Sequence, residues 1–295
     1  MEEIKVTPML QQYLQIKERY QDAILFFRLG DFYEMFFEDA QTASKILDIA
    51  LTSRNKNADS SVPLCGVPYH SAEPYIQKLL DAGHKVAVCE QVEDPKTAKG
   101  VVQREVIRVI TPGTVTAAEA LDARGNNFLA ALYKRAGSFG LAVTDITTGE
   151  FRCTQIAHDL ALFDEIGRIK PSELLTSGRD RRLLDRLQKD FPFLHLTAVK
   201  EDSFSDAAAS RLSTVHGANV QAWHEGICAA SAILGYLETN AAESLKVLRE
   251  LEPYETSHYL VLDETTRKNL ELEANYHGDR KGSLLAILDR TLTPM

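Results

Sequence analysis

The sequence has no long apolar run and no sign of a targeting segment at its start. No uninterrupted apolar stretch approaches the roughly 18 residues that a membrane-spanning helix needs. Residues 1–5 contain neither a basic cluster nor the apolar core that signal peptides carry. We therefore expect an intracellular, cytoplasmic protein without a membrane partner.

Cysteine is also scarce, and the four cysteines lie far apart. Cys65, Cys89, Cys153 and Cys228 form no C-x-x-C pair, have no histidine at ligand spacing and stand among apolar residues. Zinc sites and disulfide frameworks usually show closely spaced pairs. The sequence therefore predicts four buried thiols, no metal site and no disulfide.

Motifs for nucleotide binding and for hydrolysis are missing as well. The chain contains no G-x-x-x-x-G-K-[ST], no G-x-G-x-x-G and no G-x-S-x-G. Residues 278–283 hold two glycines and a lysine but lack the spacing of a phosphate-binding loop. We expect this chain to bind no cofactor and not to be an enzyme by itself.

An excess of basic residues is absent, which limits how the chain could bind nucleic acid. The net charge is −9, and acidic residues outnumber basic ones within residues 1–115 too. Non-specific duplex binding depends on Lys and Arg that neutralise phosphates. Any DNA contact must therefore be local, and other segments must supply much of the phosphate binding.

Length and composition predict more than one domain. Hydrophobic residues make up 44% and charged residues 25% of the 295 residues, which is ordinary globular usage. At about 150 residues per domain, two domains and a remaining piece are expected. The polar run 116–127 is the predicted linker, so we expect domains at 1–115 and 128–245 and the start of a truncated third domain at 246–295.

The first domain shows alternating helix and strand patterns. Thr7 before Pro8 is typical of a helix start, and Gly30 with Asp31 separates two strand-like runs as in a hairpin. The pattern predicts helices near 7–16, 40–50 and 71–80, and strands at 23–29, 32–37, 85–92 and 104–110. Together they indicate a small α/β domain with a mixed sheet.

The second domain begins with three strands joined by short turns. Strands are predicted at 128–133, 139–145 and 150–154, followed by helices and strands in alternation at 160–169, 173–176, 179–189 and 195–199. This order is typical of a ribonuclease-H-like domain. A long helix at 220–251, alternating runs at 259–262 and 268–272, and an apolar helix at 282–292 complete the prediction.

A ribonuclease-H-like order raises the alternative of a metal-dependent nuclease. Asp145 ends a predicted strand where such nucleases carry a metal-binding carboxylate, and Glu150 and Asp185 are its only candidate companions. Two-metal hydrolysis needs several carboxylates around ions roughly 4 Å apart. An Asp145 that caps the following turn is the simpler interpretation.

The strand at 32–37 carries the most informative side chains. Alternate residues of a strand share a face, so Tyr33, Met35 and Phe37 are predicted to face the core while Phe32 and Glu34 are exposed together. Taken alone, this pattern also fits a core phenylalanine beside a solvated glutamate.

Short motifs along the chain resemble those of one protein family, in that family's order. They are Thr7-Pro8-Met9, Phe27-Arg28-Leu29-Gly30-Asp31-Phe32-Tyr33-Glu34, Leu51-Thr52-Ser53-Arg54, Cys65-Gly66-Val67-Pro68-Tyr69-His70, Cys89-Glu90-Gln91, Val109-Ile110-Thr111-Pro112-Gly113-Thr114, Val143-Thr144-Asp145-Ile146-Thr147-Thr148-Gly149-Glu150-Phe151, Leu270-Glu271-Leu272, Lys281-Gly282-Ser283-Leu284-Leu285 and Leu288-Asp289-Arg290-Thr291. On these residues the chain resembles the MutS family, across its mismatch-recognition domain, its connector domain and the start of its helical core.

The resemblance implies a sensor of mismatched or looped duplex DNA. Phe32 would enter beside a mispaired base from the minor groove, Glu34 would hydrogen-bond that base, and Arg54 and Lys56, taken to lie in a polar loop, would contact phosphates. An inserted aromatic side chain unstacks a base step and kinks the duplex, at a lower cost where pairing is defective.

The resemblance also implies partners and missing parts. It implies a MutL-type matchmaker as partner, a homodimeric full-length protein, and an ATPase domain using ATP and Mg that lies outside this chain. It further implies a bacterial protein associated with the nucleoid. A ribonuclease-H-like nuclease and a protein-interaction module without DNA contact remain the alternatives.

Overall fold

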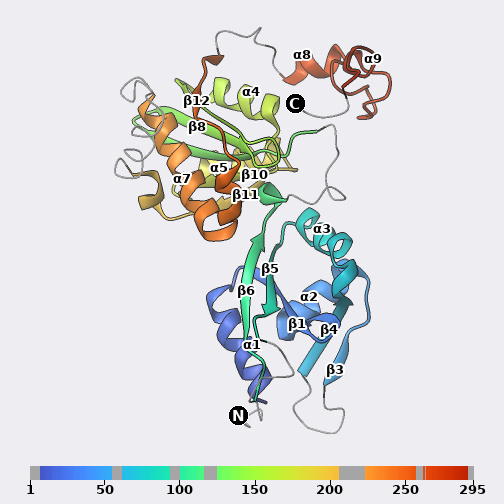
Figure 1. Cartoon of the computed structure of the whole chain (residues 1–295). Helices are drawn as coiled ribbons and strands as arrows, with labels where there is room; N and C mark the ends of the chain where they lie inside the picture. The colour runs from blue at the N-terminus through green and yellow to red at the C-terminus, as the bar shows by residue number, and fades with distance from the viewer. Residues whose placement is uncertain are drawn as a thin grey trace. The chain divides into compact units, whose positions relative to one another are not determined.

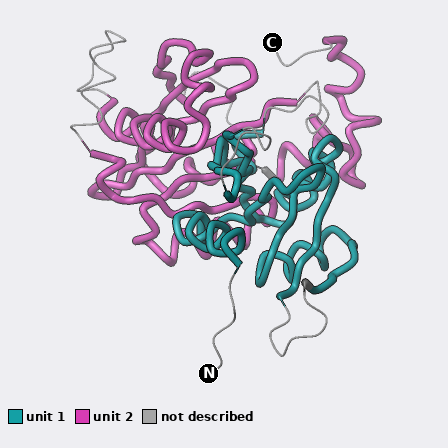
Figure 2. Tube along the Cα trace, turned by 60° about the horizontal axis from the view of Figure 1, so that its bottom comes forward, with its two compact units in different colours: residues 1–120 teal, residues 121–295 magenta. Residues whose placement is uncertain are grey.

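The computed structural model describes residues 7–54, 62–93, 100–115, 125–205, 223–256, 262 and 264–291. The chain divides into two compact units, Met1–Ala120 and Leu121–Met295, shown in Figure 2. Each unit contains one six-stranded sheet with helices packed against it. Within the described ranges, no helix combines the length and the apolar character needed to cross a membrane.

The sheet of unit 1 is mixed, as predicted. Its strands are β1 (Ala23–Leu29), β2 (Phe32–Phe36), β3 (Thr52–Arg54), β4 (Val62–Pro68), β5 (Lys85–Gln91) and β6 (Arg104–Ile110), in the order β3-β4-β2-β1-β5-β6 (Figure 1). Strands β1 and β5 are parallel and the other pairs are antiparallel. The predicted hairpin of β1 and β2 therefore lies at the centre of the sheet.

Helices cover both faces of this sheet. They are α1 (Pro8–Arg19), α2 (Phe37–Leu47) and α3 (Glu73–Asp81), with short 3-10 turns η1 (Tyr69–Ser71) and η2 (Pro112–Thr114). Helix α1 begins where predicted, because the Thr7 side chain accepts a hydrogen bond from the Leu10 amide and Pro8 needs no partner for its nitrogen. Gly83, with φ +85°, follows α3 in the left-handed conformation that the sequence predicted.

The end of β2 corrects one prediction. The strand stops at Phe36, and Phe37 begins α2 with a left-handed φ of +54°. Phe36 is fully buried under α1, where its ring lies 5.0 Å from that of Tyr13. The even-numbered face of β2 is thus covered at one end, and Phe37 is not the strand residue that the sequence predicted.

The sheet of unit 2 combines an antiparallel centre with parallel flanks. Its strands are β7 (Leu129–Arg135), β8 (Ser138–Asp145), β9 (Glu150–Ile156), β10 (Glu173–Thr176), β11 (His195–Ala198) and β12 (Glu252–Pro253), in the order β11-β10-β7-β8-β9-β12. The meander β7-β8-β9 and the parallel additions β10 and β11 agree with the predicted ribonuclease-H-like order. Strand β12 pairs with β9 and was not predicted.

Helices of unit 2 build a separate core on each face of this sheet. They are α4 (Asp159–Ile169), α5 (Arg181–Asp190) and α7 (His224–Asn240), with the 3-10 turns η3 (Glu201–Phe204) and η4 (Ala242–Lys246). One core joins α7 to the sheet, and the other joins α4 and α5 to its opposite face. Helix α7 approaches β8 so closely that a Cβ at Gly140 would lie 1.9 Å from the Glu225 carbonyl oxygen.

The later part of unit 2 differs from the sequence prediction. Within the described residues, the helix predicted at 220–251 is observed as α7, and η4 and β12 follow it in place of further helix. Residues 206–222 lie outside the described ranges. Most of the alternating run 259–262 is also outside them. Lys268 lies in helix α8 (Glu264–Asn269) and not in a strand, while α9 (Leu284–Leu288) falls within the predicted apolar helix.

Candidate nucleic-acid interface

Phe32 lies at the tip of the central hairpin. It is the first residue of β2, directly after the Gly30 and Asp31 turn, in which Gly30 adopts a left-handed φ of +58°. Its side chain is 47% exposed, although most of β1 and β2 is buried. The hairpin therefore presents an aromatic ring to solvent, as the sequence predicted.

Glu34 shares the face of Phe32 and is half-buried. Its register partners are Phe27 on β1 and Gly66 on β4. Gly66 has no side chain, and the Glu34 side chain lies over it, since a Cβ at Gly66 would be 3.5 Å from Glu34 Cγ. An aromatic ring and a carboxylate two residues apart thus lie on one face, as predicted, while Tyr33 and Met35 are buried on the other.

The opposite face of the hairpin tip carries a connected polar cluster. The buried Tyr33 hydroxyl donates a hydrogen bond to Glu90, and burial, together with that carboxylate, raises the pKa of Tyr33 to about 12. The Arg28 guanidinium lies between Glu90 and the ring of Tyr69. The sequence motifs included all four residues, but alternation alone assigned no role to Arg28, Tyr69 or Glu90.

Arg104 connects the hairpin to α1 and β6. Its guanidinium donates to the carbonyls of Arg28 and Val102, at 2.6 and 2.7 Å, and to Gln12 Oε1 at 3.1 Å. It also lies 4.9 Å from the centre of the Phe27 ring, and burial lowers its pKa. These contacts tie three elements together, so the structure gives Arg104 a structural role.

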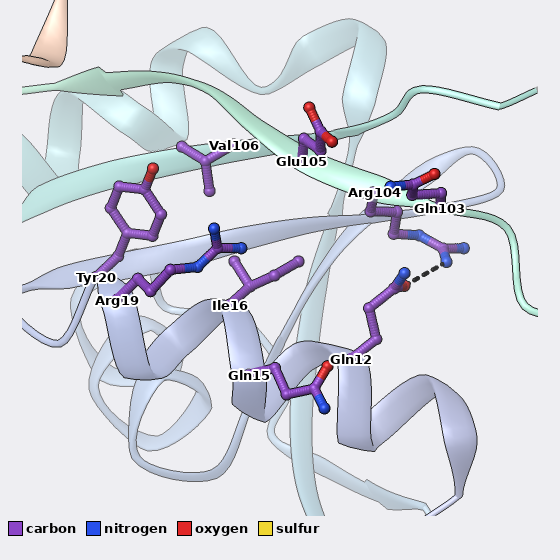
Figure 3. A pocket seen from close by; sticks show the side chains of 9 residues that line it. All are labelled: Gln12, Gln15, Ile16, Arg19, Tyr20, Gln103, Arg104, Glu105 and Val106. Carbon is purple, nitrogen blue, oxygen red and sulfur yellow. Dashed lines mark hydrogen bonds between the residues drawn. The ribbon is translucent and has the colours of Figure 1, made fainter.

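A polar hollow of about 480 Å³ lies beside Arg104, between α1 and β6 (Figure 3). Figure 3 shows Gln12 of α1 reaching toward Arg104 across one end of the hollow. Its lining residues are Gln12, Gln15, Ile16, Arg19, Tyr20, Gln103, Arg104, Glu105 and Val106. The sequence did not predict this hollow, because it joins segments about 90 residues apart.

The two predicted phosphate contacts are only partly located. Arg54 is the last residue of β3 and pairs with Val62 of β4, so its predicted place in a loop is wrong. Lys56 lies outside the described residues.

Two carboxylates of the nuclease alternative, Asp145 and Glu150, are register partners on β8 and β9, but both are engaged in other contacts. Asp145 is fully buried and accepts hydrogen bonds from Asn126, the Asn127 amide, and the amide and hydroxyl of Thr147. These bonds occupy its oxygens in capping the turn. Glu150 pairs with Arg152 at 2.6 Å, and the described part of the chain holds no group of three metal-ligating side chains.

All four cysteines are buried thiols, in agreement with the sequence prediction. Burial raises the pKa of Cys65 to about 11 and those of Cys89 and Cys153 to about 12. The reactive thiolate form is therefore suppressed at neutral pH.

Comparison with known proteins gives the chain a family. The family model of MutS domain I matches residues 7–119, and that of MutS domain II matches residues 127–249. A DNA mismatch repair protein MutS from Ruminiclostridium cellulolyticum is 44% identical over 301 residues, covering 98% of this chain and 34% of that protein. The proteins of the same name from Syntrophobacter fumaroxidans and Desulforapulum autotrophicum are 45% and 47% identical, each over 99% of this chain and 34% of their own length.

The chain spans about a third of the length of the curated relatives that it matches. The two matching domains follow one another in the same order as units 1 and 2 of the structure. With these matches and this fold, the chain belongs to the MutS family.

Proposed function

We propose that unit 1 recognises mispaired or unpaired bases in duplex DNA during mismatch repair. The observation that carries this proposal is the exposed Phe32 ring at the tip of the central hairpin, with Glu34 on the same face. The names of the relatives, DNA mismatch repair protein MutS, support the same role. Phe32 inserts beside the defective base from the minor groove.

An exposed aromatic ring suits insertion into a base stack. Unstacking and kinking a base step costs a few kcal/mol, and the cost is lower where pairing is already defective. Stacking of a base on an aromatic side chain returns about 1–3 kcal/mol. The difference in cost between a mismatch and an intact pair therefore becomes a difference in affinity.

Glu34 adds specificity in this proposal. A carboxylate near phosphates is repelled, so it cannot contribute much to overall affinity. Beside an inserted Phe32 it faces the base edges, where it accepts a hydrogen bond from a displaced base, or donates one when protonated. Glu34 thus lowers the affinity for intact pairs and raises the affinity for mispairs.

The remaining parts of the proposal concern the full-length protein. Arg54 and Lys56 supply phosphate contacts, and unit 2 transmits the state of unit 1 to an ATPase domain that uses ATP and Mg. The full-length protein acts as a homodimer and hands the signal to a MutL-type matchmaker, with unit 2 as a contact surface. The present chain is not itself an enzyme in this scheme.

The test compares two phenylalanines of equal exposure in the full-length protein. Phe32 is 47% exposed on unit 1 and Phe193 is 46% exposed on unit 2. Phe32→Ala should abolish the preference for G·T and single-base-insertion duplexes over homoduplex, through the loss of about 1–3 kcal/mol of stacking. Phe193→Ala should leave the preference unchanged. Affinities for all duplexes are measured at one salt concentration, because salt alone shifts them.

Two outcomes would contradict the proposal. A Phe32→Ala protein that keeps its full mismatch preference would exclude Phe32 as the inserted group. Equal losses from Phe32→Ala and Phe193→Ala would show that the effect comes from exposed rings in general. A nuclease on unit 2 would instead require metal-dependent cleavage abolished by Asp145→Asn.

A further inference from the structure

We propose that Arg28 is a positioning residue that holds the Phe32 hairpin tip rigid, acting with Tyr33, Tyr69 and Glu90 as a brace on the reverse face of the sheet. The proposal rests on the proposed insertion of Phe32. In this proposal the brace holds the hairpin tip in the conformation needed for insertion before DNA binds, and mismatch preference depends on that.

The brace fastens the turn that carries Phe32. Arg28 Nε donates to the carbonyl oxygen of Gly30 at 2.6 Å, and the Tyr69 amide donates to the carbonyl oxygen of Asp31 at 3.0 Å. Both carbonyl groups of the two-residue turn are therefore bound by groups outside the turn. Phe32 follows immediately, and its register partners on the two neighbouring strands are Leu29 and Pro68.

Arg28 is itself held by several contacts. Its guanidinium carbon lies 3.3 Å from the centre of the Tyr69 ring and 5.7 Å from that of Tyr33, and Nη1 lies 3.5 Å from Glu90 Oε1. Glu90 also accepts the Tyr33 hydroxyl. The backbone carbonyl of Arg28 accepts a 2.6 Å hydrogen bond from Arg104, so main chain and side chain are both anchored.

The geometry requires arginine. A planar guanidinium can stack on the Tyr69 ring while its edge donates to the Gly30 carbonyl and faces Glu90. A lysine ammonium keeps the charge but cannot stack and donate in one plane. The Arg28 side chain is 15% exposed, which favours the cation–π contact because little water competes for it.

The brace and the inserting pair lie on opposite faces. Arg28 and Tyr33 are register partners and share the reverse face, whereas Phe32 and Glu34 share the front face. The brace thus acts through the backbone of the turn and not through a contact of Arg28 with the base.

The rigidity of the hairpin tip affects only the affinity of the complex in which Phe32 is inserted. Ordering a loose turn at the moment of binding would reduce the affinity of any complex that uses Phe32. Contacts to the backbone of homoduplex do not use Phe32, so their affinity is unaffected. Loss of the brace should therefore reduce mismatch preference without weakening homoduplex binding.

The experiment compares Arg28→Lys with Arg108→Lys in the full-length protein. Arg108 lies in the same unit on β6, pairs with Glu73 at 2.8 Å and takes no part in the hairpin tip. Arg28→Lys should lower mismatch preference about fivefold to thirtyfold, which corresponds to the ~1–2 kcal/mol of ordering one residue's backbone. Homoduplex affinity should stay unchanged, and Arg108→Lys should change neither value.

Two further measurements separate positioning from a general loss of stability. In a Phe32→Ala background, Arg28→Lys should have no additional effect on mismatch preference. Hydrogen exchange at the amides of residues 31–33 should be faster in Arg28→Lys, while the melting temperature stays close to wild type. Tyr69→Ala removes the stacking partner at an exposed position and should reproduce the loss if Arg28→Lys folds poorly.

The outcomes distinguish this inference from the proposed function. If Phe32→Ala retains mismatch preference, the insertion itself is wrong. If Phe32→Ala loses it while Arg28→Lys and Tyr69→Ala keep it, insertion stands and the brace is wrong. If Arg28→Lys weakens homoduplex and mismatch binding equally, Arg28 is a phosphate contact and the brace is also wrong.

Discussion

The contact between α7 and β8 makes Gly140 a sensitive position in unit 2. A Cβ there would lie 1.9 Å from the Glu225 carbonyl oxygen, 2.0 Å from its carbonyl carbon and 2.5 Å from the Gly226 nitrogen. Carbon atoms in contact prefer about 3.5–4.0 Å. Gly140→Ala therefore forces the backbone of α7 away from β8 by about 1.5 Å.

The structure also suggests how large the effect should be. Overpacking a core usually costs about 1–3 kcal/mol when side chains can adjust. Here the added atom meets main chain, and a Cβ at Gly226 on the same helix would already lie 3.0 Å from the Thr154 carbonyl oxygen of β9. We expect the upper end of that range, about 3 kcal/mol, which for a unit of this size lowers the melting temperature by about 6–12 °C.

Gly235 provides a control within the same helix. It lies inside α7, and a Cβ there would meet nothing within 4 Å. Glycine in a helix interior costs about 0.5–1 kcal/mol relative to alanine. Gly235→Ala should therefore raise the free energy of unfolding, whereas Gly140→Ala lowers it.

The chain contains its own probe for this measurement. Trp223 is the single tryptophan, stands at the start of α7 and packs against the core between α7 and the sheet. Urea and thermal unfolding followed by Trp223 fluorescence report on unit 2 alone. Gly140→Ala with wild-type stability would refute the close packing of α7 on β8.

Two more predictions concern single side chains. Glu34→Ala in the full-length protein should leave total DNA affinity unchanged or higher while it narrows the gap between mismatch and homoduplex, measured by titration at constant salt; a uniform loss of affinity would contradict the assigned role. The thiols of Cys65, Cys89, Cys153 and Cys228 are buried, and burial raises the pKa of the first three. A thiol reagent at pH 8 should therefore modify these cysteines only in denaturant. Rapid labelling of the native chain would contradict their burial.

The elements predicted well are those whose interactions are local in sequence. The β1-β2 hairpin follows from a two-residue turn between two strand-like runs, and Gly30 supplies the left-handed φ that this turn needs. The β7-β8-β9 meander follows for the same reason, with Gly137 and Gly149 in left-handed turns. Such features need only neighbouring residues, so alternation and turn residues suffice.

Strand β4 was not predicted from the sequence because of its composition. Pro63, Gly66 and Pro68 fall within seven residues, and both residue types are depleted in strands. The prolines stand near the two ends of β4, and Gly66 faces Glu34 across the ladder. Long-range pairing with β2 and β3 holds this segment in the sheet against its local preference.

The brace could not be predicted from spacing either. Arg28, Tyr69 and Glu90 belong to β1, η1 and β5. The parallel pairing of β1 with β5 brings Arg28 and Glu90 together, and the pairing of β2 with β4 brings Tyr69 to the same end. The MutS-like motifs mark all three residues without saying that they touch. Sequence therefore indicates the residues of the tip, and tertiary structure shows how they act on the turn.

Phe32 and Phe36 show why alternation alone cannot define the interface. Both lie on the same face of β2, four residues apart. Alternation along the strand therefore predicts the same exposure for both side chains. Tyr13 of α1 covers Phe36 and donates a hydrogen bond to its carbonyl oxygen, whereas Phe32 at the other end is 47% exposed. The path of α1 over the sheet decides which phenylalanine is core and which stays exposed, so the candidate interface depends on both the strand and the helix that covers part of it.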